Sequence, residues 1–145
     1  LGGLYYSGHG VTKDYKEAKY WFSEAAKQGL ARAQYRLGIM HYHGYGGIID
    51  WMEAFRWFRM AAVQGFALGQ ANLGFMYANG QSVEKDLIMA YVWWDVAAAN
   101  GEADHAPQGR EIVAKLLDRA DLAKAITLSK RCQKKPSRCP ERNDD

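Results

Sequence analysis

The chain has 145 residues, of which 48% are hydrophobic and 24% are charged, so its length and composition exclude a disordered or low-complexity protein. No stretch approaches the roughly twenty consecutive apolar residues of a membrane helix, because charges or glycines interrupt every hydrophobic run. Thirteen Lys or Arg balance thirteen Asp or Glu over residues 1–129, which argues against the basic face of a nucleic-acid-binding protein.

A repeat of 36 residues organises most of the chain. The pair Leu1-Gly2 recurs as Leu37-Gly38 and again as Leu73-Gly74. Further columns agree in all three copies: Gly8, Gly44 and Gly80; Asp14, Asp50 and Asp86; Ala18, Ala54 and Ala90; Trp21, Trp57 and Trp93; and Gly29, Gly65 and Gly101. We therefore predict a truncated first repeat over residues 1–30, a second over residues 31–66 and a third over residues 67–102.

Each repeat is predicted to form two helices. The first helices, residues 31–43 and 67–79, carry the Leu-Gly pair. A glycine inside a helix lowers stability by about 1 kcal/mol relative to alanine, so its recurrence at one register indicates close helix packing. The second helix, predicted over residues 50–64, has one face that is expected to be buried. That face comprises Ala54, Trp57, Phe58, Ala61 and Ala62.

Residues at both ends of the second helix indicate where it starts and stops. Asp14 followed by Glu17, and Asp50 followed by Glu53, have the spacing of a capping box. Glycines that favour a left-handed backbone stand at the other end. These are Gly29, Gly65 and Gly101.

The pattern fades after Gly101. Residues 103–135 are predicted to form a degenerate capping pair, with helices over residues 108–117 and about 120–134. Pro107 is expected to break the first turns of the leading helix. A terminal repeat departs from the consensus because it covers the last apolar face and presents a polar one to water.

Residues 136–145 are predicted to be a polar, basic tail. The basic side chains in and before it could contact nucleic acid or anionic lipid, but such residues more often keep a helix end solvated. They are Lys130, Arg131, Lys134, Lys135, Arg138 and Arg142. Cys132 and Cys139 are seven residues apart with Pro136 between them. A turn could close them into a disulfide if the protein is exported, and free thiols are the alternative.

The repeated residues resemble the Sel-1-like repeat, a relative of the tetratricopeptide repeat. In the first copy the matching positions are Leu1-Gly2, Tyr5, Gly8, Gly10, Val11, Asp14, Ala18, Trp21-Phe22, Ala25-Ala26 and Gly29. His41, Gly47, Gly69 and Ser82 depart from the pattern. The resemblance implies an all-α fold, an α-solenoid in which antiparallel helix pairs form a right-handed superhelix. It also implies a scaffold or adaptor for other proteins, often in bacteria.

The resemblance further implies where a partner would bind. In tetratricopeptide repeats the first helices line a concave groove, and the corresponding positions follow here from the register of the Leu-Gly pairs. They are Arg32, Tyr35, Ile39, Tyr42 and His43 in the second repeat, and Leu68, Phe75 and Asn79 in the third. Aromatic, aliphatic and arginine side chains are common at the energetic centres of interfaces. The alternative is that several of these residues belong to the core between the helix layers.

Metal and catalytic sites are weakly indicated. His41 and His43 are two residues apart on a helix and point about 200° apart, so we expect no metal site. Ser82 and Lys85 have the Ser-x-x-Lys spacing of penicillin-binding enzymes, but Ser82 is predicted to lie in a loop. No phosphate-binding glycine loop is recognised and no cofactor is expected.

The favoured function is a non-enzymatic scaffold that binds a protein or peptide. The alternatives are a penicillin-binding or cell-wall-active enzyme acting through Ser82, and a structural module that self-assembles. We expect a monomer, or weak stacking between copies. Because Leu1 falls inside a predicted helix, the native N-terminus is expected to be missing together with any signal peptide. A periplasmic or secreted location is favoured.

Overall fold

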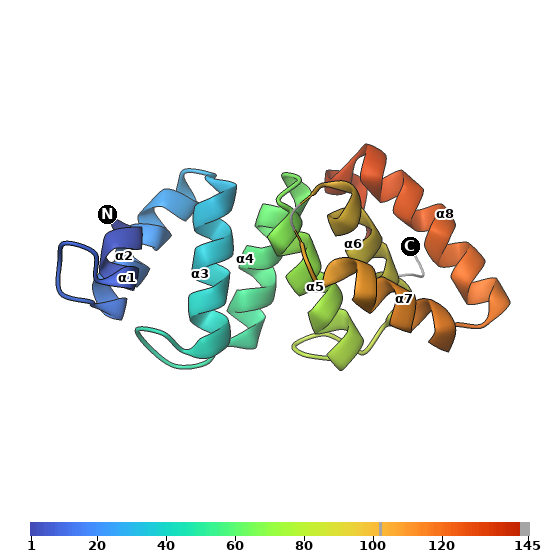
Figure 1. Ribbon diagram of the computed structural model, residues 1–145, viewed down its shortest axis with the longest axis horizontal. Helices are drawn as coiled ribbons and strands as arrows, with labels where there is room; N and C mark the ends of the chain where they lie inside the picture. Colours follow the sequence, from blue (N-terminus) through green and yellow to red (C-terminus); the bar gives the residue numbers. More distant parts are fainter. Residues whose placement is uncertain (102, 143–145) are drawn as a thin grey trace. The chain divides into compact units, whose positions relative to one another are not determined.

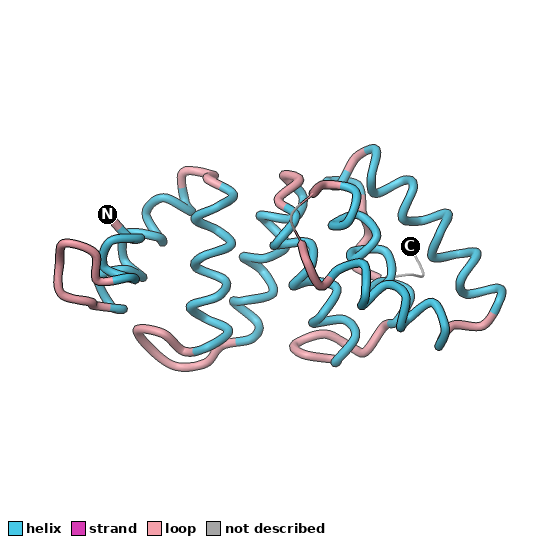
Figure 2. The backbone as a smooth tube through the Cα atoms, in the orientation of Figure 1, coloured by secondary structure: helices cyan, strands magenta, loops and turns pink. Residues whose placement is uncertain are grey.

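The computed structural model describes residues 1–101 and 103–142, and all regular structure in these ranges is helical (Figure 1, Figure 2). The prediction of an all-α repeat fold is therefore confirmed. The chain divides into two compact units, Leu1–Ala61 and Ala62–Asp145, which are described separately. The helices are α1 (Gly2–Ser7), α2 (Tyr15–Lys27), α3 (Ala31–His43), α4 (Trp51–Val63), α5 (Ala67–Asn79), α6 (Leu87–Ala99), α7 (Ala106–Leu116), α8 (Arg119–Lys134) and the 3₁₀ helix η1 (Pro136–Arg138).

The glycine of each Leu-Gly pair allows an aromatic ring to lie against the backbone of the first helix. A Cβ atom on Gly38 would lie 2.7 Å from the ring of Phe58, and one on Gly74 would lie 2.7 Å from the ring of Trp94. Gly2 and Phe22 have the same relation at 3.0 Å. The predicted close packing is thus confirmed, and it explains why the Gly and Phe or Trp columns recur together.

The aspartate column fixes the loop as well as the start of the second helix. The Asp14 carboxylate accepts hydrogen bonds from the amides of Lys16 and Glu17, at 2.8 and 3.1 Å. The Asp14 amide donates to the carbonyl oxygen of Tyr5, on the first helix, at 3.0 Å. Asp50 and Asp86 each accept one such bond, from the amides of Glu53 and Met89, and donate their own amides to the carbonyls of His41 and Tyr77. The aspartate half of the predicted capping box is therefore confirmed, while the aspartate amide bonds to the neighbouring helix.

Buried glutamines tie one repeat to the next. The side-chain amide of Gln34 on α3 donates to the carbonyl of Ala26 at the end of α2, at 3.3 Å. Gln70 on α5 makes the same bond to Ala62 at 2.9 Å. Both glutamines are at most 2% exposed, so their hydrogen bonds satisfy polar groups that would otherwise be buried without partners.

The predicted apolar face of the second helix is largely buried. In α4 the side chains of Ala54, Phe58 and Ala61 are at most 1% exposed. The tryptophan column is less uniform, because Trp93 is fully buried while Trp57 is half-buried. Trp57 nevertheless packs on the apolar cluster formed by α2 and α3.

The capping helices begin earlier than the sequence predicted. Pro107 was expected to break the first turns of α7, but it lies within the first turn, where the missing amide leaves no helical hydrogen bond unmade. A Cβ atom on Gly109 would lie 2.8 Å from the ring of Trp94. Trp94 therefore packs between Gly74 on α5 and Gly109 on α7, and its indole N–H donates to the carbonyl of Ala71 at 3.0 Å.

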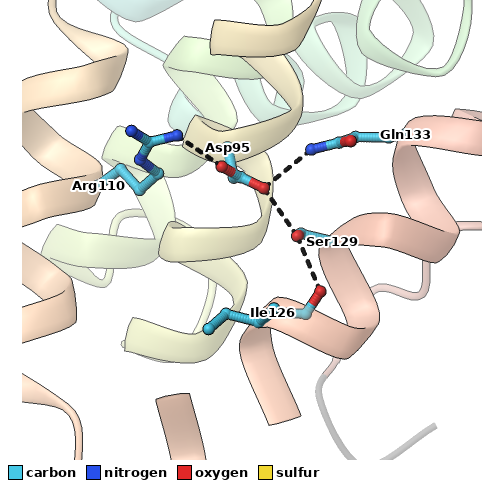
Figure 3. Close-up of polar contacts among 5 residues, drawn as sticks. All are labelled: Asp95, Arg110, Ile126, Ser129 and Gln133. Carbon is cyan, nitrogen blue, oxygen red and sulfur yellow. Dashed lines mark hydrogen bonds and ion pairs between the residues drawn. The ribbon is translucent and has the colours of Figure 1, made fainter. Parts of the chain in front are cut away.

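Asp95 on α6 connects both capping helices to the third repeat (Figure 3). Its carboxylate accepts hydrogen bonds from Arg110 on α7 at 2.7 Å, and from Ser129 and Gln133 on α8 at 2.8 Å each. The ion pair raises the pKa of the Arg110 guanidinium, chiefly through its hydrogen bond to Asp95. Because one side chain receives donors from two helices, it orients both of them on α6.

The segment after α8 is held to the third repeat. Cys132 and Cys139 form a disulfide with their Cα atoms 4.9 Å apart, and both side chains are buried. The Tyr77 hydroxyl on α5 donates to the carbonyl oxygen of Glu141 at 2.6 Å. The six basic side chains of this region remain exposed, so its backbone is anchored while its charges face solvent.

Candidate functional site

None of the eight predicted groove residues is fully buried, and equivalent positions of the two repeats have similar exposure. Arg32 on α3 and Leu68 on α5 are exposed, as are His43 and Asn79 at the other ends of these helices. Phe75 is 46% exposed. The remaining three, Tyr35, Ile39 and Tyr42, are half-buried. One face of each first helix therefore stays accessible within its own unit.

Two of these residues also contribute to packing. The ring centroids of Tyr35 and Tyr42 lie 5.9 and 6.5 Å from that of Phe58 on α4. Asn79 donates its side-chain amide to the carbonyl of Phe75, one turn earlier, at 2.9 Å. Arg32, Leu68 and Phe75 are therefore the positions where a substitution changes the surface with least effect on the helix pairs.

The first helices carry little charge, and what they carry is positive. Helix α3 contains Arg32 and Arg36 and no Asp or Glu, and α5 contains neither acidic nor basic residues. The guanidinium of Arg36 lies 5.8 Å from the ring centroid of Tyr6. These two helices therefore contribute no acidic side chain.

A row of aromatic rings in contact with one another, which sequence reasoning missed, continues from the end of α3. Ring centroids are 6.3 Å apart for Trp51 and Tyr42, 5.0 Å for Tyr42 and His43, and 5.2 Å for His43 and Tyr45. Tyr45 then stacks on Tyr15 at 4.8 Å. We call these five residues the aromatic ladder. The signal in the sequence is the density of aromatic residues around one loop, but their order depends on contacts between two repeats.

The first unit also contains a pocket of about 880 Å³ between α1, α2 and α3, lined by residues that include Phe22, Arg32 and Arg36. We assign no ligand to this pocket.

The candidates for metal binding in the sequence are His41 and His43, and the candidate for catalysis is Ser82. No cluster of three or more His, Cys, Asp or Glu within residues 1–101 and 103–142 could hold a metal ion. Burial, followed by the charge of Lys19, lowers the pKa of His41. Ser82 is exposed in the loop between α5 and α6, and its φ of 64° is close to the 75° and 74° of Gly10 and Gly46. Its backbone conformation therefore follows from its place in a glycine column.

Comparison with family models identifies these helix pairs. The model described as Sel1 repeat matches residues 1–30, 31–66 and 67–102. The chain belongs to the Sel1 repeat family. Comparison with curated proteins finds no match.

Two solved structures of Sel1 repeat proteins are similar to this chain. A Sel1 repeat protein from Oxalobacter formigenes is 30% identical with a TM-score of 0.73, over 83% of this chain and 48% of that one. The protein c5321, a protective antigen of uropathogenic Escherichia coli with an SLR fold, is 35% identical with a TM-score of 0.87, over 93% of this chain and 29% of that one. The chain thus spans less than half the length of either protein.

Sel1 repeats are protein-interaction modules. No helix in the described part of the chain has the length and hydropathy needed to cross a bilayer.

Proposed function

We propose that this chain is a non-enzymatic scaffold that binds a protein or peptide on the exposed faces of α3 and α5. One observation carries the proposal: the same face of the first helix is accessible in two successive Sel1 repeats, although each unit packs its other faces. Equivalent positions are Arg32 and Leu68, Ile39 and Phe75, and His43 and Asn79. Side chains of these kinds, arranged at one register, are suited to bind an extended or helical segment.

Exposed apolar surface on this face would contribute free energy to binding when a partner covers it. Burying apolar surface contributes about 25 cal/mol per Å², so covering Phe75 and Leu68 is favourable before any polar contact forms. Arg32 adds a charge that can pair with a carboxylate on the partner. These contributions support the binding of a protein rather than the turnover of a small substrate.

Photo-crosslinking in the native cell tests the proposal. A benzophenone side chain placed at Phe75 or Ile39 is expected to capture the same protein, because both positions face the proposed partner. Tyr20 on α2 and Leu116 on α7, which are 56% and 65% exposed, serve as control positions. Equal capture from the controls, or no capture from either test position, contradicts the proposal. Capture of a second copy of this chain would indicate self-assembly instead.

We also propose that the protein works in the periplasm or outside the cell. A disulfide persists in oxidising compartments and is rare in the cytosol, and the similar protein c5321 is a protective antigen. Both observations support export without identifying the partner. Alkylation of protein taken directly from the native cell tests it: we expect Cys132 and Cys139 to resist alkylation until a reductant is added, and free thiols would contradict export.

A further inference from the structure

The loop of the second repeat exposes apolar side chains where the other repeats have polar or charged ones. Ile48 and Ile49 in the loop are 81% and 59% exposed, and Trp51 and Met52 at the start of α4 are 44% and 68% exposed. We call these four residues the loop patch. The matching loop positions hold Thr12 and Lys13 in the first repeat, and Glu84 and Lys85 in the third.

The fold of the loop does not require isoleucine at position 49. Gly44 and Gly8 have left-handed backbones with φ of 73° and 75°. A Cβ atom on Gly44 would lie 3.0 Å from the Ile49 side chain, and one on Gly8 would lie 3.2 Å from the Lys13 Cβ. The two loops therefore have the same local packing with isoleucine or with lysine. Four exposed apolar residues within five positions are what a binding surface would present.

The loop patch is continuous with the aromatic ladder. Trp51 belongs to both, and the ladder includes Tyr42 and His43 from the predicted groove. Large aromatic and aliphatic side chains are enriched at the centres of protein interfaces, where Trp and Tyr are frequent hot spots. The surface available to a partner thus extends from the face of α3 around the end of that helix to the loop.

Charges of both signs lie beside the loop patch, and most of the carboxylates among them are engaged within the repeats. The Lys13 ammonium lies 4.7 Å from the ring centroid of Tyr15, at the end of the ladder. The Lys19 ammonium lies 3.3 Å from where a Cβ on Gly47 would be. Of the nearby carboxylates, Asp14 and Asp50 cap helices and Glu53 pairs with Arg56 at 2.6 Å. Glu17 is exposed in the first turn of α2.

We propose that the loop patch and the aromatic ladder together dock a protein segment in which apolar side chains are flanked by carboxylates. The proposal rests on the proposed function, because it extends the contact of the same partner beyond the first-helix face. The apolar side chains would cover Ile48, Ile49 and Trp51, and the carboxylates would lie near Lys13 and Lys19. Complementary charge would orient the segment and accelerate its association.

Methyl NMR tests this with isoleucine-labelled protein, because the patch and its controls are both isoleucines. The probes are two synthetic peptides with the same central Leu and Trp residues, one flanked by Glu and the other by Lys. We expect the Glu-flanked peptide to shift the Ile48 and Ile49 methyl signals. The Lys-flanked peptide should bind with at least tenfold lower affinity. Ile112 and Ile126, which are 60% and 36% exposed in the other unit, should not shift.

A variant that copies the first repeat provides the matched comparison. Ile48→Thr with Ile49→Lys introduces residues that the same loop already accommodates, so the melting temperature should be unchanged while affinity for the Glu-flanked peptide falls at least tenfold. Ile112→Thr with Leu116→Lys, on α7, should leave affinity unchanged. Equal affinity of the loop variant and the wild type overturns the inference.

The remaining outcomes separate this inference from the proposed function. Shifts confined to Ile39 on α3, or no shifts while the photo-crosslinks persist, overturn the loop site and leave the scaffold function standing. Shifts caused by phosphatidylglycerol vesicles and not by peptide would indicate a lipid surface. Shifts that depend on protein concentration alone would indicate a second copy of the chain. Either of these last results overturns docking of an acidic segment.

Discussion

Gly10 and Gly46 occupy the same position in two loops and share a left-handed backbone, but only Gly46 lies against another part of the chain. A Cβ atom on Gly46 would lie 2.5 Å from the carbonyl oxygen of Tyr15, whereas one on Gly10 would have no neighbour within 4 Å. In the third repeat Ser82 adopts a similar conformation with φ of 64°. The backbone therefore accepts a side chain here unless a neighbour excludes it.

Replacing each glycine by alanine should separate these two effects. Gly10→Ala is expected to lower the free energy of unfolding by about 1 kcal/mol, because alanine disfavours the left-handed conformation. Gly46→Ala should lower it by about 3 kcal/mol or more, because the backbone of Tyr15 must also move. Urea unfolding followed by circular dichroism measures both values. Equal losses would show that the contact with Tyr15 is unimportant.

The sequence predicted the glycine column but not this difference. The column follows from comparing the repeats, whereas the contact joins Gly46 to a residue of the preceding repeat. In the sequence, Ser82 was recognisable only as a residue that replaces glycine in this column, and its left-handed backbone became known from the structure. A single sequence shows which conformation a position favours, while its neighbours become known only from the packed helices.

Each helix pair depends on a glycine in the first helix facing an aromatic ring in the second. Alanine at position 38 would gain about 1 kcal/mol in helix propensity, but its Cβ would lie 2.7 Å from the Phe58 ring. Overpacking of this kind typically lowers stability by about 1–3 kcal/mol. The steric effect should therefore exceed the gain in propensity.

We expect Gly38→Ala to be less stable than the wild type by up to about 2 kcal/mol, and Gly3→Ala, which has open space around it, to be no less stable. In a protein that already carries Phe58→Leu, the Gly38→Ala substitution should lower stability by less than it does in the wild type. The smaller leucine side chain leaves room for the added methyl group. A double-mutant cycle in thermal unfolding measures this coupling. A Gly38→Ala protein that is more stable than the wild type would contradict the packing described here.

The capping helices should depend on Asp95. Asp95→Ala removes the acceptor of Arg110 and Gln133 and one of the two acceptors of Ser129, so we expect a loss of about 2–3 kcal/mol. Hydrogen exchange should rise first in α7 and α8, because these are the helices that Asp95 orients. Asp104→Ala, at an exposed carboxylate in the same unit, should change stability by less than about 0.5 kcal/mol. Unchanged exchange in α8 would show that apolar contacts alone hold the cap.

Prediction at the level of helices was accurate where the repeat is regular and poorer beyond it. The predicted ranges of α3 and α5 match the structure, because the Leu-Gly register and terminal glycines mark them clearly. In the cap, Arg110 replaces the repeat glycine and pairs with Asp95, while Gly109 takes over the contact with Trp94. This shift by one residue could not be predicted, since it depends on how α7 is oriented on α6.

At the scale of the whole molecule, the repeat pattern predicts the candidate binding surface less completely than it predicts the helices. The register predicted eight groove positions, and the structure leaves all eight at least partly exposed. The register did not predict the aromatic ladder, whose members come from three helices, α2, α3 and α4, and from the loop after α3. The contrast of Ile48 and Ile49 with Thr12 and Lys13 was visible in the sequence. It indicates a binding surface only once the structure shows that both isoleucine side chains are exposed.

The most direct test of the scaffold function is the affinity for the partner identified by crosslinking, measured by titration calorimetry. We expect Arg32→Glu with Phe75→Ala to raise Kd at least tenfold, about 1.4 kcal/mol, with an unchanged melting temperature because both side chains are exposed. An unchanged Kd in this correctly folded variant would contradict binding on the first-helix faces.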